Sequence, residues 1–298
     1  MSPARTTGRT ACCLLLLFLP ATASAHDGSH HPVWTYDPWI VAPLALSAIA
    51  YFAGVGELWR RAGRGRGIRL RQAALYAAGW VVLAGALLSP LHWLGEHLFT
   101  AHMIEHELVM AVAAPLLALA RPLGAFVWAL PLSVRQAFAL ASRQQSVRSA
   151  WRVATRPAVA TIAHGAAIWL WHVPALFDAA LTVPWLHRLQ HLSFLFTAVL
   201  FWWALIRRSD AGAAVGHLVF TMIHTGLLGA LLTLSPRLLY VAQTADAPGW
   251  GLSPLEDQQL AGLVMWIPVG TVYAGAALAF VALWLRRSAK VWKDGYAS

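Results

Sequence analysis

The stretch "TAHMIEHELVMAVAAPLLALARP", residues 100–122, is apolar over most of its length. It is close to the ~20 residues that a helix needs to cross the hydrocarbon of a bilayer. Yet His102, Glu105, His106 and Glu107 fall within its first turns. Ionisable side chains inside a membrane are energetically costly and usually functional. The stretch therefore predicts a transmembrane helix that carries part of a functional site close to one membrane surface.

The composition of the whole chain also indicates a membrane protein. Of its 298 residues, 59% are hydrophobic and 11% are charged, whereas soluble domains carry about 25% charged residues. Several apolar segments are long enough to cross a bilayer, and lipid requires their backbone polar groups to be satisfied within helices. They lie near 39–59, 72–90, 100–120, 157–175, 186–206, 216–236 and 258–285. The predicted fold class is all-α, a polytopic bundle of seven transmembrane helices.

The first 25 residues have the pattern of a cleaved signal peptide. Arg5 and Arg9 form the positive start, "ACCLLLLFLP" the apolar core, and "ATASA" the small residues before cleavage at Ala25. An uncleaved anchor is the alternative, but an apolar run of about 10 residues is short for a span. Cys12 and Cys13, the two cysteines of the chain, lie in this segment. Any metal in the mature chain would therefore be held by His, Met and carboxylate groups.

The positive charges predict the orientation in the membrane. Of the 20 Lys and Arg residues after residue 25, 18 fall in alternate loops and at the C-terminus. Loops rich in Lys and Arg stay in the cytoplasm, which places the N-terminus outside and the C-terminus inside a bacterial inner membrane. The net charge of +10 is therefore a topology signal and does not indicate nucleic acid. One long basic loop, residues 121–156, has the amphipathic pattern of an interfacial helix. The expected regions are a signal peptide (1–25), a periplasmic His-containing tail (26–38), the transmembrane domain (39–285) and a basic cytoplasmic tail (286–298).

Five histidines from three segments are expected at one depth near the outer surface. A helix rises about 1.5 Å per residue, and residues four apart share a face. The pairs His102/His106 and His187/His191 have this spacing in segments that enter from outside, and His172 ends an outward-running segment. Imidazole suits copper, zinc and iron, while thioether favours Cu(I). The layer predicts a metal site. Copper fits best because the layer offers imidazole and thioether without thiolate, and zinc is weaker because the His-Glu-x-x-His motif of zinc proteases is absent.

Other side chains accompany this layer as candidates for additional ligands or for groups that orient a ligand. They are Met103, Glu105, Met110, Asp178, Asp257, Gln258 and Met265, with the deeper His164 and His224. In the N-terminal tail, His26, His30 and His31 are candidates for gathering metal. Taken singly, each histidine is better explained as polar glue between helices, and each methionine as core filler. The prediction of a metal site rests on the group.

The residues leave other functions open. His164 and His224 lie at similar depth on different segments, and such a pair can ligate haem b in a membrane redox protein. A relay of histidines also suits a copper- or proton-coupled transporter, although the chain lacks the paired repeat of broken helices that many transporters have. A scaffold that holds another protein during its maturation would need no metal.

Four motifs give the chain a resemblance to a known family. They read "AHMIEHELVMAVAAPLLALARPL", "WLWHVPALFDAAL", "LHRLQHLSFLFTAVLFWW" and "EDQQLAGLVMWIP", and they span the chain from about the second segment to the seventh. Together they resemble the CtaG family of multi-spanning cytochrome c oxidase assembly factors. The resemblance implies a protein that is not an enzyme. It implies instead that copper passes from a periplasmic donor to the buried copper centre of the oxidase's catalytic subunit.

The resemblance also implies which residues take part. They are His102, His106, His172, His187, His191, Asp257, Gln258 and Met265. The family often has methionine directly after the second histidine of the first motif, where this chain has Glu107. This difference weakens a methionine relay at that point and leaves the imidazoles as the main candidate ligands.

Overall fold

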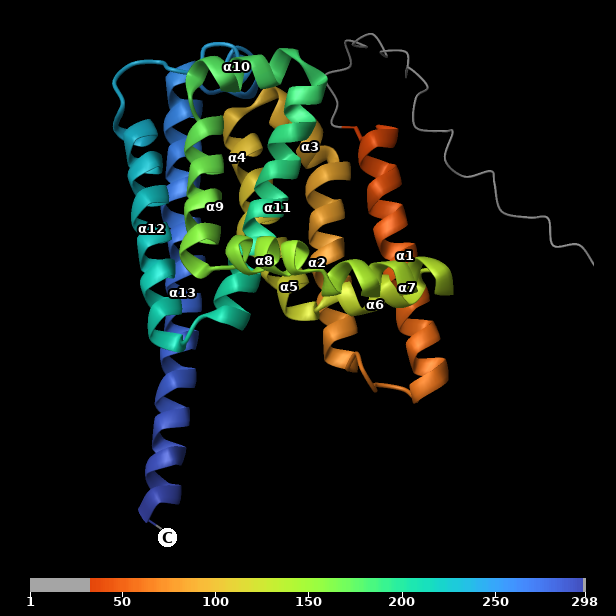
Figure 1. Ribbon diagram of the computed structural model, residues 1–298. Helices are drawn as coiled ribbons and strands as arrows, with labels where there is room; N and C mark the ends of the chain where they lie inside the picture. Colours follow the sequence, from red (N-terminus) through yellow and green to blue (C-terminus); the bar gives the residue numbers. More distant parts are fainter. Residues whose placement is uncertain (1–32, 297–298) are drawn as a thin grey trace, which may run out of the picture. The chain divides into compact units, whose positions relative to one another are not determined.

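The structure is a computed structural model that describes residues 33–296, and every regular element in that range is a helix (Figure 1). The first elements are α1 (Pro38–Ala62), α2 (Leu70–Leu88), α3 (Pro90–His97), α4 (Phe99–Glu107), the π-helix η1 (Leu108–Ala113), α5 (Ala114–Ala120), α6 (Pro122–Ala129) and α7 (Leu132–Arg143). The later elements are α8 (Gln145–Ala154), α9 (Pro157–Trp171), α10 (Pro174–Thr182), α11 (Pro184–Arg208), α12 (Ala211–Leu234), the 3-10 helix η2 (Ala247–Trp250) and α13 (Pro254–Tyr296). The expected signal peptide and the tail histidines His26, His30 and His31 lie outside the described residues.

Six helical segments are long and apolar enough to cross a membrane. They are α1, α2, the continuous run α4–η1–α5, α11, α12 and α13. The pair α9–α10 passes the same test together but is bent by 75°, so the described residues contain six or seven candidate spans. These helices coincide with the seven predicted segments, which confirms the all-helical, polytopic fold class.

The bend between α9 and α10 has a local cause. Pro174 has no backbone N–H to continue a helix, and it disfavours helical geometry in the residue before it. Val173 is accordingly extended, with φ −68° and ψ 121°. The helix therefore ends at Trp171, earlier than the predicted segment 157–175, and His172 lies at its C-cap.

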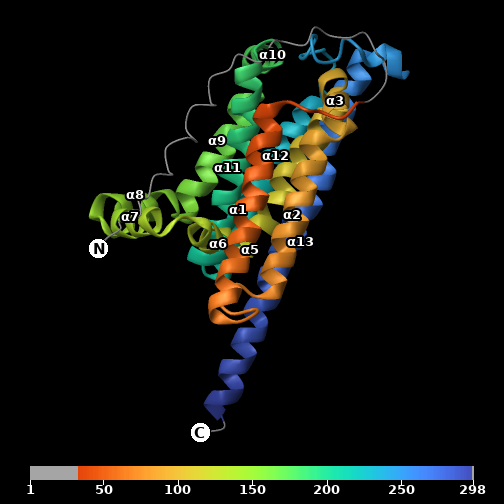
Figure 2. The same ribbon diagram turned by 90° about the vertical axis from the view of Figure 1, so that its right-hand side faces the viewer.

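Short helices lie at the two ends of the long ones. In Figures 1 and 2, α3, α10 and the 235–253 loop lie at one end, while α6, α7 and α8 lie across the long helices towards the other. The basic loop 121–156 thus contains helices, and α7 and α8 bury none of their residues. The arginine-rich ends of α1 and α11 lie on this same side (Figure 1). Most basic residues are therefore segregated to the end of the bundle opposite α3 and α10, with Arg188 and Arg237 as the exceptions.

The run α4–η1–α5 is the most enclosed of the candidate spans, with 56% of its apolar window buried. It contains a π-helical stretch directly after Glu107, a feature that is frequent at functional sites. The indole Nε1 of Trp202 donates a hydrogen bond to the Met110 carbonyl oxygen at 3.0 Å, which satisfies a carbonyl within this stretch. The segment that carries His102 and His106 is thus surrounded by the other helices.

Two glycines bring α12 and α13 into backbone contact. A Cβ added to Gly229 would lie 2.7 Å from the Gly262 carbonyl oxygen. A Cβ added to Gly262 would lie 2.6 Å from the Gly229 carbonyl oxygen. Small residues allow this close approach of membrane helices.

We expect Gly262→Ala to destabilise the protein by about 1–3 kcal/mol, the usual cost of forcing extra volume into a packed interface. Thermal unfolding of the detergent-purified protein measures this cost. Gly275→Ala on the same helix is the matched control, because nothing lies within 4 Å of a Cβ there. Equal melting temperatures for the two variants would contradict the close approach of α12 and α13.

Candidate metal centre

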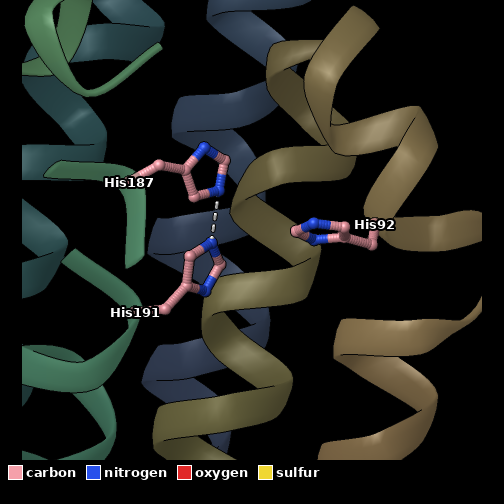
Figure 3. Close-up of side chains that lie close together, drawn as sticks. All are labelled: His92, His187 and His191. Carbon is pink, nitrogen blue, oxygen red and sulfur yellow. Dashed lines mark hydrogen bonds between the residues drawn. The ribbon is translucent and has the colours of Figure 1, made fainter. Parts of the chain in front are cut away.

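Three histidines from α3 and α11 converge at the end of the bundle that carries α3 and α10. One ring nitrogen from each of His92, His187 and His191 lies within 4.8 Å of the other two (Figure 3). The two Nε2 atoms of His187 and His191 are 2.7 Å apart, so one of them donates a hydrogen bond to the other. The side chains of His92 and His191 are only 7% and 11% exposed, so water competes little for their nitrogens. We call these three residues the outer triad.

Glu105 on α4 faces the outer triad with a buried carboxylate. His92 Nδ1 donates a hydrogen bond to Glu105 Oε1 at 2.8 Å, and the same oxygen lies 3.7 Å from His191 Nδ1. A carboxylate in this position fixes the tautomer and leaves Nε2 with its lone pair for a metal. Burial lowers the pKa of His92, but the charge and hydrogen bond of Glu105 outweigh it and raise the pKa above its ordinary value. Glu105 therefore orients an imidazole, as a carboxylate beside a metal ligand does.

The His102/His106 pair on α4 lies against the outer triad. The two ring centroids are 4.2 Å apart, and the His106 ring is 5.0 Å from the His191 ring. Both side chains are buried. His102 Nδ1 lies 3.2 Å from the Gly95 carbonyl oxygen and donates to it. Within the described part of the chain, His102 Nε2 and both nitrogens of His106 have no hydrogen-bond partner.

Such unpartnered nitrogens bear on the chemistry of the site. Buried polar atoms are nearly always hydrogen-bonded, and leaving one unsatisfied costs about 1–3 kcal/mol. A metal ion would satisfy a lone pair on a ring nitrogen without a hydrogen bond. The donor set of buried imidazoles therefore fits a late transition metal.

His172 lies beside this group but outside the outer triad. Its Nδ1 donates to the Ile168 carbonyl oxygen at 2.7 Å, and its Nε2 has no partner among the described residues. Its ring is 6.4 Å from each of the rings of Phe177 and Phe194. Those phenylalanines also contact His102 and His106, with centroids 5.1 and 4.7 Å apart, respectively. His172 thus lies beside the same two phenylalanine rings as His102 and His106.

Asp257 and Gln258, at the start of α13, hold backbone groups around the histidines. Asp257 accepts hydrogen bonds from the backbone N–H groups of Phe99 and Thr100 at 2.8 and 2.9 Å. It thereby caps α4, whose own N-cap residue provides no side-chain hydrogen bond. Gln258 Oε1 accepts from the Leu239 N–H at 2.6 Å. Both residues position the elements around the histidines.

The remaining candidates lie in the apolar core of the bundle and on α10. Met103, Met110 and Met265 belong to one buried apolar core. Asp178 on α10 has one buried carboxylate oxygen without a partner in the described residues. Burial and then the charge of Asp178 raise the pKa of Tyr240. The Tyr240 hydroxyl donates to the carbonyl oxygen at residue 172 at 2.5 Å.

The deeper histidines are engaged with other side chains. His164 Nδ1 is 3.2 Å from Thr197 Oγ1, and its Nε2 is 3.4 Å from the Tyr273 hydroxyl. The Trp169 indole donates to His224 Nδ1 at 3.3 Å. These contacts are the interhelical hydrogen bonds that polar residues make in membrane bundles.

The sequence analysis did not identify His92, which is one of the three residues of the outer triad. It treated residues 91–99 as a connection between spans, whereas they contain most of α3. The sequence does carry a signal for that helix, because Ser-Pro is a typical helix start. Ser89 Oγ accepts from the Leu91 N–H at 3.2 Å, with Pro90 at the first helical position. That signal places His92 in the first turn of a helix next to α4.

Comparison with known proteins assigns the family. The family model of the cytochrome c oxidase caa3 assembly factors (Caa3_CtaG) matches residues 49–287. Uncharacterised proteins of Mycobacterium bovis and Mycobacterium tuberculosis are each 26% identical over 275 residues, which cover 87% of this chain and 40% of theirs. One of Mycobacterium leprae is 24% identical over 276 residues, with the same coverage. The chain thus spans about two fifths of the length of these curated relatives, and no solved structure gives a significant match. The match over most of its length means that the chain belongs to the family of cytochrome c oxidase caa3 assembly factors.

Proposed function

We propose that this protein binds copper in its histidine cluster and delivers it to the catalytic subunit of a haem-copper cytochrome c oxidase. The convergence of His92, His187 and His191 is the observation that carries the proposal. The family supports the oxidase as the destination, because a haem-copper oxidase must receive copper in its catalytic subunit during assembly.

The chemistry of the cluster supports copper as the cargo. Residues 33–296 contain no cysteine, so imidazole, thioether and carboxylate are the ligand types at hand. Desolvation favours the neutral form of a buried imidazole, which is the form that binds a metal. Imidazole sites favour copper over the other divalent first-row metals, and the buried methionines suit Cu(I). A carrier only holds and releases an ion, so it needs neither a water bound to the metal nor the motif of a metalloprotease.

The position of the cluster supports the route. The cluster lies at the end of the bundle opposite the arginine-rich loops. The positive-inside rule assigns those loops to the cytoplasm, and the cluster therefore to the periplasmic side of a bacterial inner membrane. A periplasmic donor can load the partly exposed His187 from that side. The copper centre of the oxidase is buried within the membrane, so a carrier embedded in the same bilayer can release the ion to it sideways.

The haem-binding alternative has less support. It relied on His164 and His224, and both nitrogens of His164 are within hydrogen-bond distance of Thr197 and Tyr273. An axial ligand needs a ring nitrogen directed at the iron. His164 and His224 therefore have fewer ring nitrogens free to bind haem iron than the outer histidines have to bind copper.

Loss of the outer triad in cells tests the proposal. We expect cells that lack this protein to make an oxidase that contains haem but lacks copper, because only the supply of copper has been interrupted. The wild-type gene should restore the copper, and His92→Leu should not. Haem spectra and elemental analysis of the purified oxidase provide the measurement.

His97→Leu is the matched control, since His97 lies on the same short helix and bonds only to the Trp93 carbonyl oxygen among the described residues. Normal copper content in the oxidase of the His92→Leu strain would count against the proposal. So would loss of copper and haem together, which indicates a general scaffold for folding.

A further inference from the structure

An open pocket lies where α8, α9 and α11 meet at the arginine-rich end of the bundle. Its volume is about 410 Å³, which is enough for a small ligand or a lipid headgroup. The polar part of its lining comes from α8, from the two residues between α8 and α9, and from the last residue of α11. These polar residues are Ser149, Arg152, Thr155, Arg156 and Arg208. We call this site the arginine pocket.

The arginine pocket carries positive charge that no carboxylate of the protein neutralises. Its three arginines take part in no ion pair among the described residues. Its lining contains no Asp or Glu, and the sequence has none between Glu107 and Asp178. Asp210 follows α11 closely, but its Oδ1 accepts a hydrogen bond from the Ala213 N–H at 2.8 Å and caps α12. Like charges around one space repel each other, so an anion bound between them is stabilised.

The donors around the pocket fit a phosphate group. A guanidinium is always charged and presents parallel N–H groups that match two phosphate oxygens. The first turn of α9 adds to this, because Pro157 at its start also lines the pocket. Arg156, the N-cap residue, makes no side-chain hydrogen bond to the first N–H groups of this helix. The beginning of a helix favours anions, and phosphate most of all.

The surroundings of the pocket indicate a lipid as the carrier of that phosphate. Helix α8 lies across the long helices and buries none of its residues (Figure 1). Val147, Trp151 and Val153 on this helix are 43%, 40% and 46% exposed. The Trp151 ring contacts the Trp203 ring at 5.1 Å, and the guanidinium of Arg208 lies 5.7 Å from the Trp203 ring. Tryptophan is enriched at the level of the headgroups, and basic amphipathic helices bind anionic lipid surfaces.

We propose that the arginine pocket binds the phosphate of an anionic phospholipid, whose acyl chains lie along the exposed apolar side chains of α8. The positive-inside rule places this end of the bundle at the cytoplasmic leaflet, where anionic lipids attract basic residues. The site is separate from the histidine cluster and does not depend on copper. A bound lipid holds α8 against the end of α11 that lies opposite His187 and His191.

Native mass spectrometry of the full-length, detergent-purified protein tests the inference. The probes are dioleoylphosphatidylglycerol and dioleoylphosphatidylcholine, which have the same chains but differ in headgroup charge. We expect the wild type to bind the phosphatidylglycerol more tightly. Arg152→Gln/Arg156→Gln/Arg208→Gln should bind it roughly 100-fold more weakly, because each basic residue near an anionic surface contributes about fivefold. Excess inorganic phosphate should not displace the lipid.

Arg64→Gln/Arg66→Gln/Arg71→Gln is the matched control. It removes the same charge at the same end of the bundle, from the α1–α2 connection and the start of α2, and none of the three residues lines the pocket. This variant should bind phosphatidylglycerol as the wild type does. The three pocket arginines are exposed, so their replacement should leave the fold intact by gel filtration. If the triple pocket variant aggregates, its three single variants replace it, each with about fivefold weaker binding.

Four results would overturn the inference. Unchanged affinity for phosphatidylglycerol in the pocket variants would show that the arginines do not bind it. Equal weakening in the control variant would show attraction by diffuse charge without a built site. Equal binding of the two lipids by the wild type would show that the headgroup charge is not recognised. Displacement of the lipid by inorganic phosphate would show a site for a soluble anion.

Discussion

Replacing His187 and His191 with leucine is expected to remove nearly all copper from the purified protein. Both residues lie on one face of α11 and supply two of the three converging nitrogens of the outer triad. His191 also lies against His106, with ring centroids 5.0 Å apart, so the double variant disturbs the centre of the histidine cluster. We expect the affinity for copper to fall about 100-fold or more, which is at least the loss seen when only the groups that orient a metal ligand are removed. Competition with a coloured chelator of known affinity measures the change.

A double variant needs a control for the loss of buried polar contacts. His224→Leu on α12 removes an intramembrane histidine that lies outside the outer triad and should leave copper binding unchanged. Leucine is close to histidine in volume and suits an apolar surrounding, so the His187→Leu/His191→Leu protein should still insert and remain monodisperse. Unchanged copper affinity in this protein would contradict the assignment of the site to α11.

The second large effect is expected at Glu105, which binds no copper in our proposal. Its carboxylate holds the proton of His92 on Nδ1 through a 2.8 Å hydrogen bond and so leaves the other nitrogen free for the copper that we propose. We expect Glu105→Leu to weaken copper binding about 10–100-fold, the usual cost of removing such a partner. Glu105→Gln should lie in between, because its amide oxygen can still accept from His92 Nδ1 although the charge is gone.

The graded order of these two variants separates orientation from a merely structural role. If Glu105 only fills space, the isosteric Glu105→Gln protein should bind copper as the wild type does. If it were itself a ligand, both variants should lose copper to the same extent. Glu96→Gln on α3 is the control for a change of charge near the site. The copper affinities of the four proteins, measured with the same chelator, distinguish these cases.

The membrane-spanning framework could be predicted from the sequence because lipid imposes a simple physical rule. A bilayer demands long apolar helices, and the predicted segment 186–206 lies wholly within the helix Pro184–Arg208. The spacing of His102/His106 and of His187/His191 follows from helix periodicity, and both pairs do lie close to each other in space. Patterns that are local in the sequence therefore predict the fold class and the two histidine pairs of the site.

The remaining features depend on contacts between distant parts of the chain. Asp257 bonds to the start of α4 across 158 residues, and no local pattern indicates that a carboxylate on the last helix caps the third span. His92 lies on a helix of eight residues, too short to register as a span. The bend at Val173 is visible locally in Pro174, but whether His172 then lies beside the other histidines depends on how α10 packs against α11.

The central claim is that this protein holds copper in its histidine cluster. The most direct measurement is elemental analysis of the detergent-purified, full-length protein, with an absorption spectrum of the same sample. We predict near-stoichiometric copper without a haem band, and loss of that copper in the His187→Leu/His191→Leu protein. A strong haem band with little copper would contradict the proposal and indicate a membrane cytochrome. Absence of any metal after loading with Cu(I) would contradict it equally and leave a role as a scaffold.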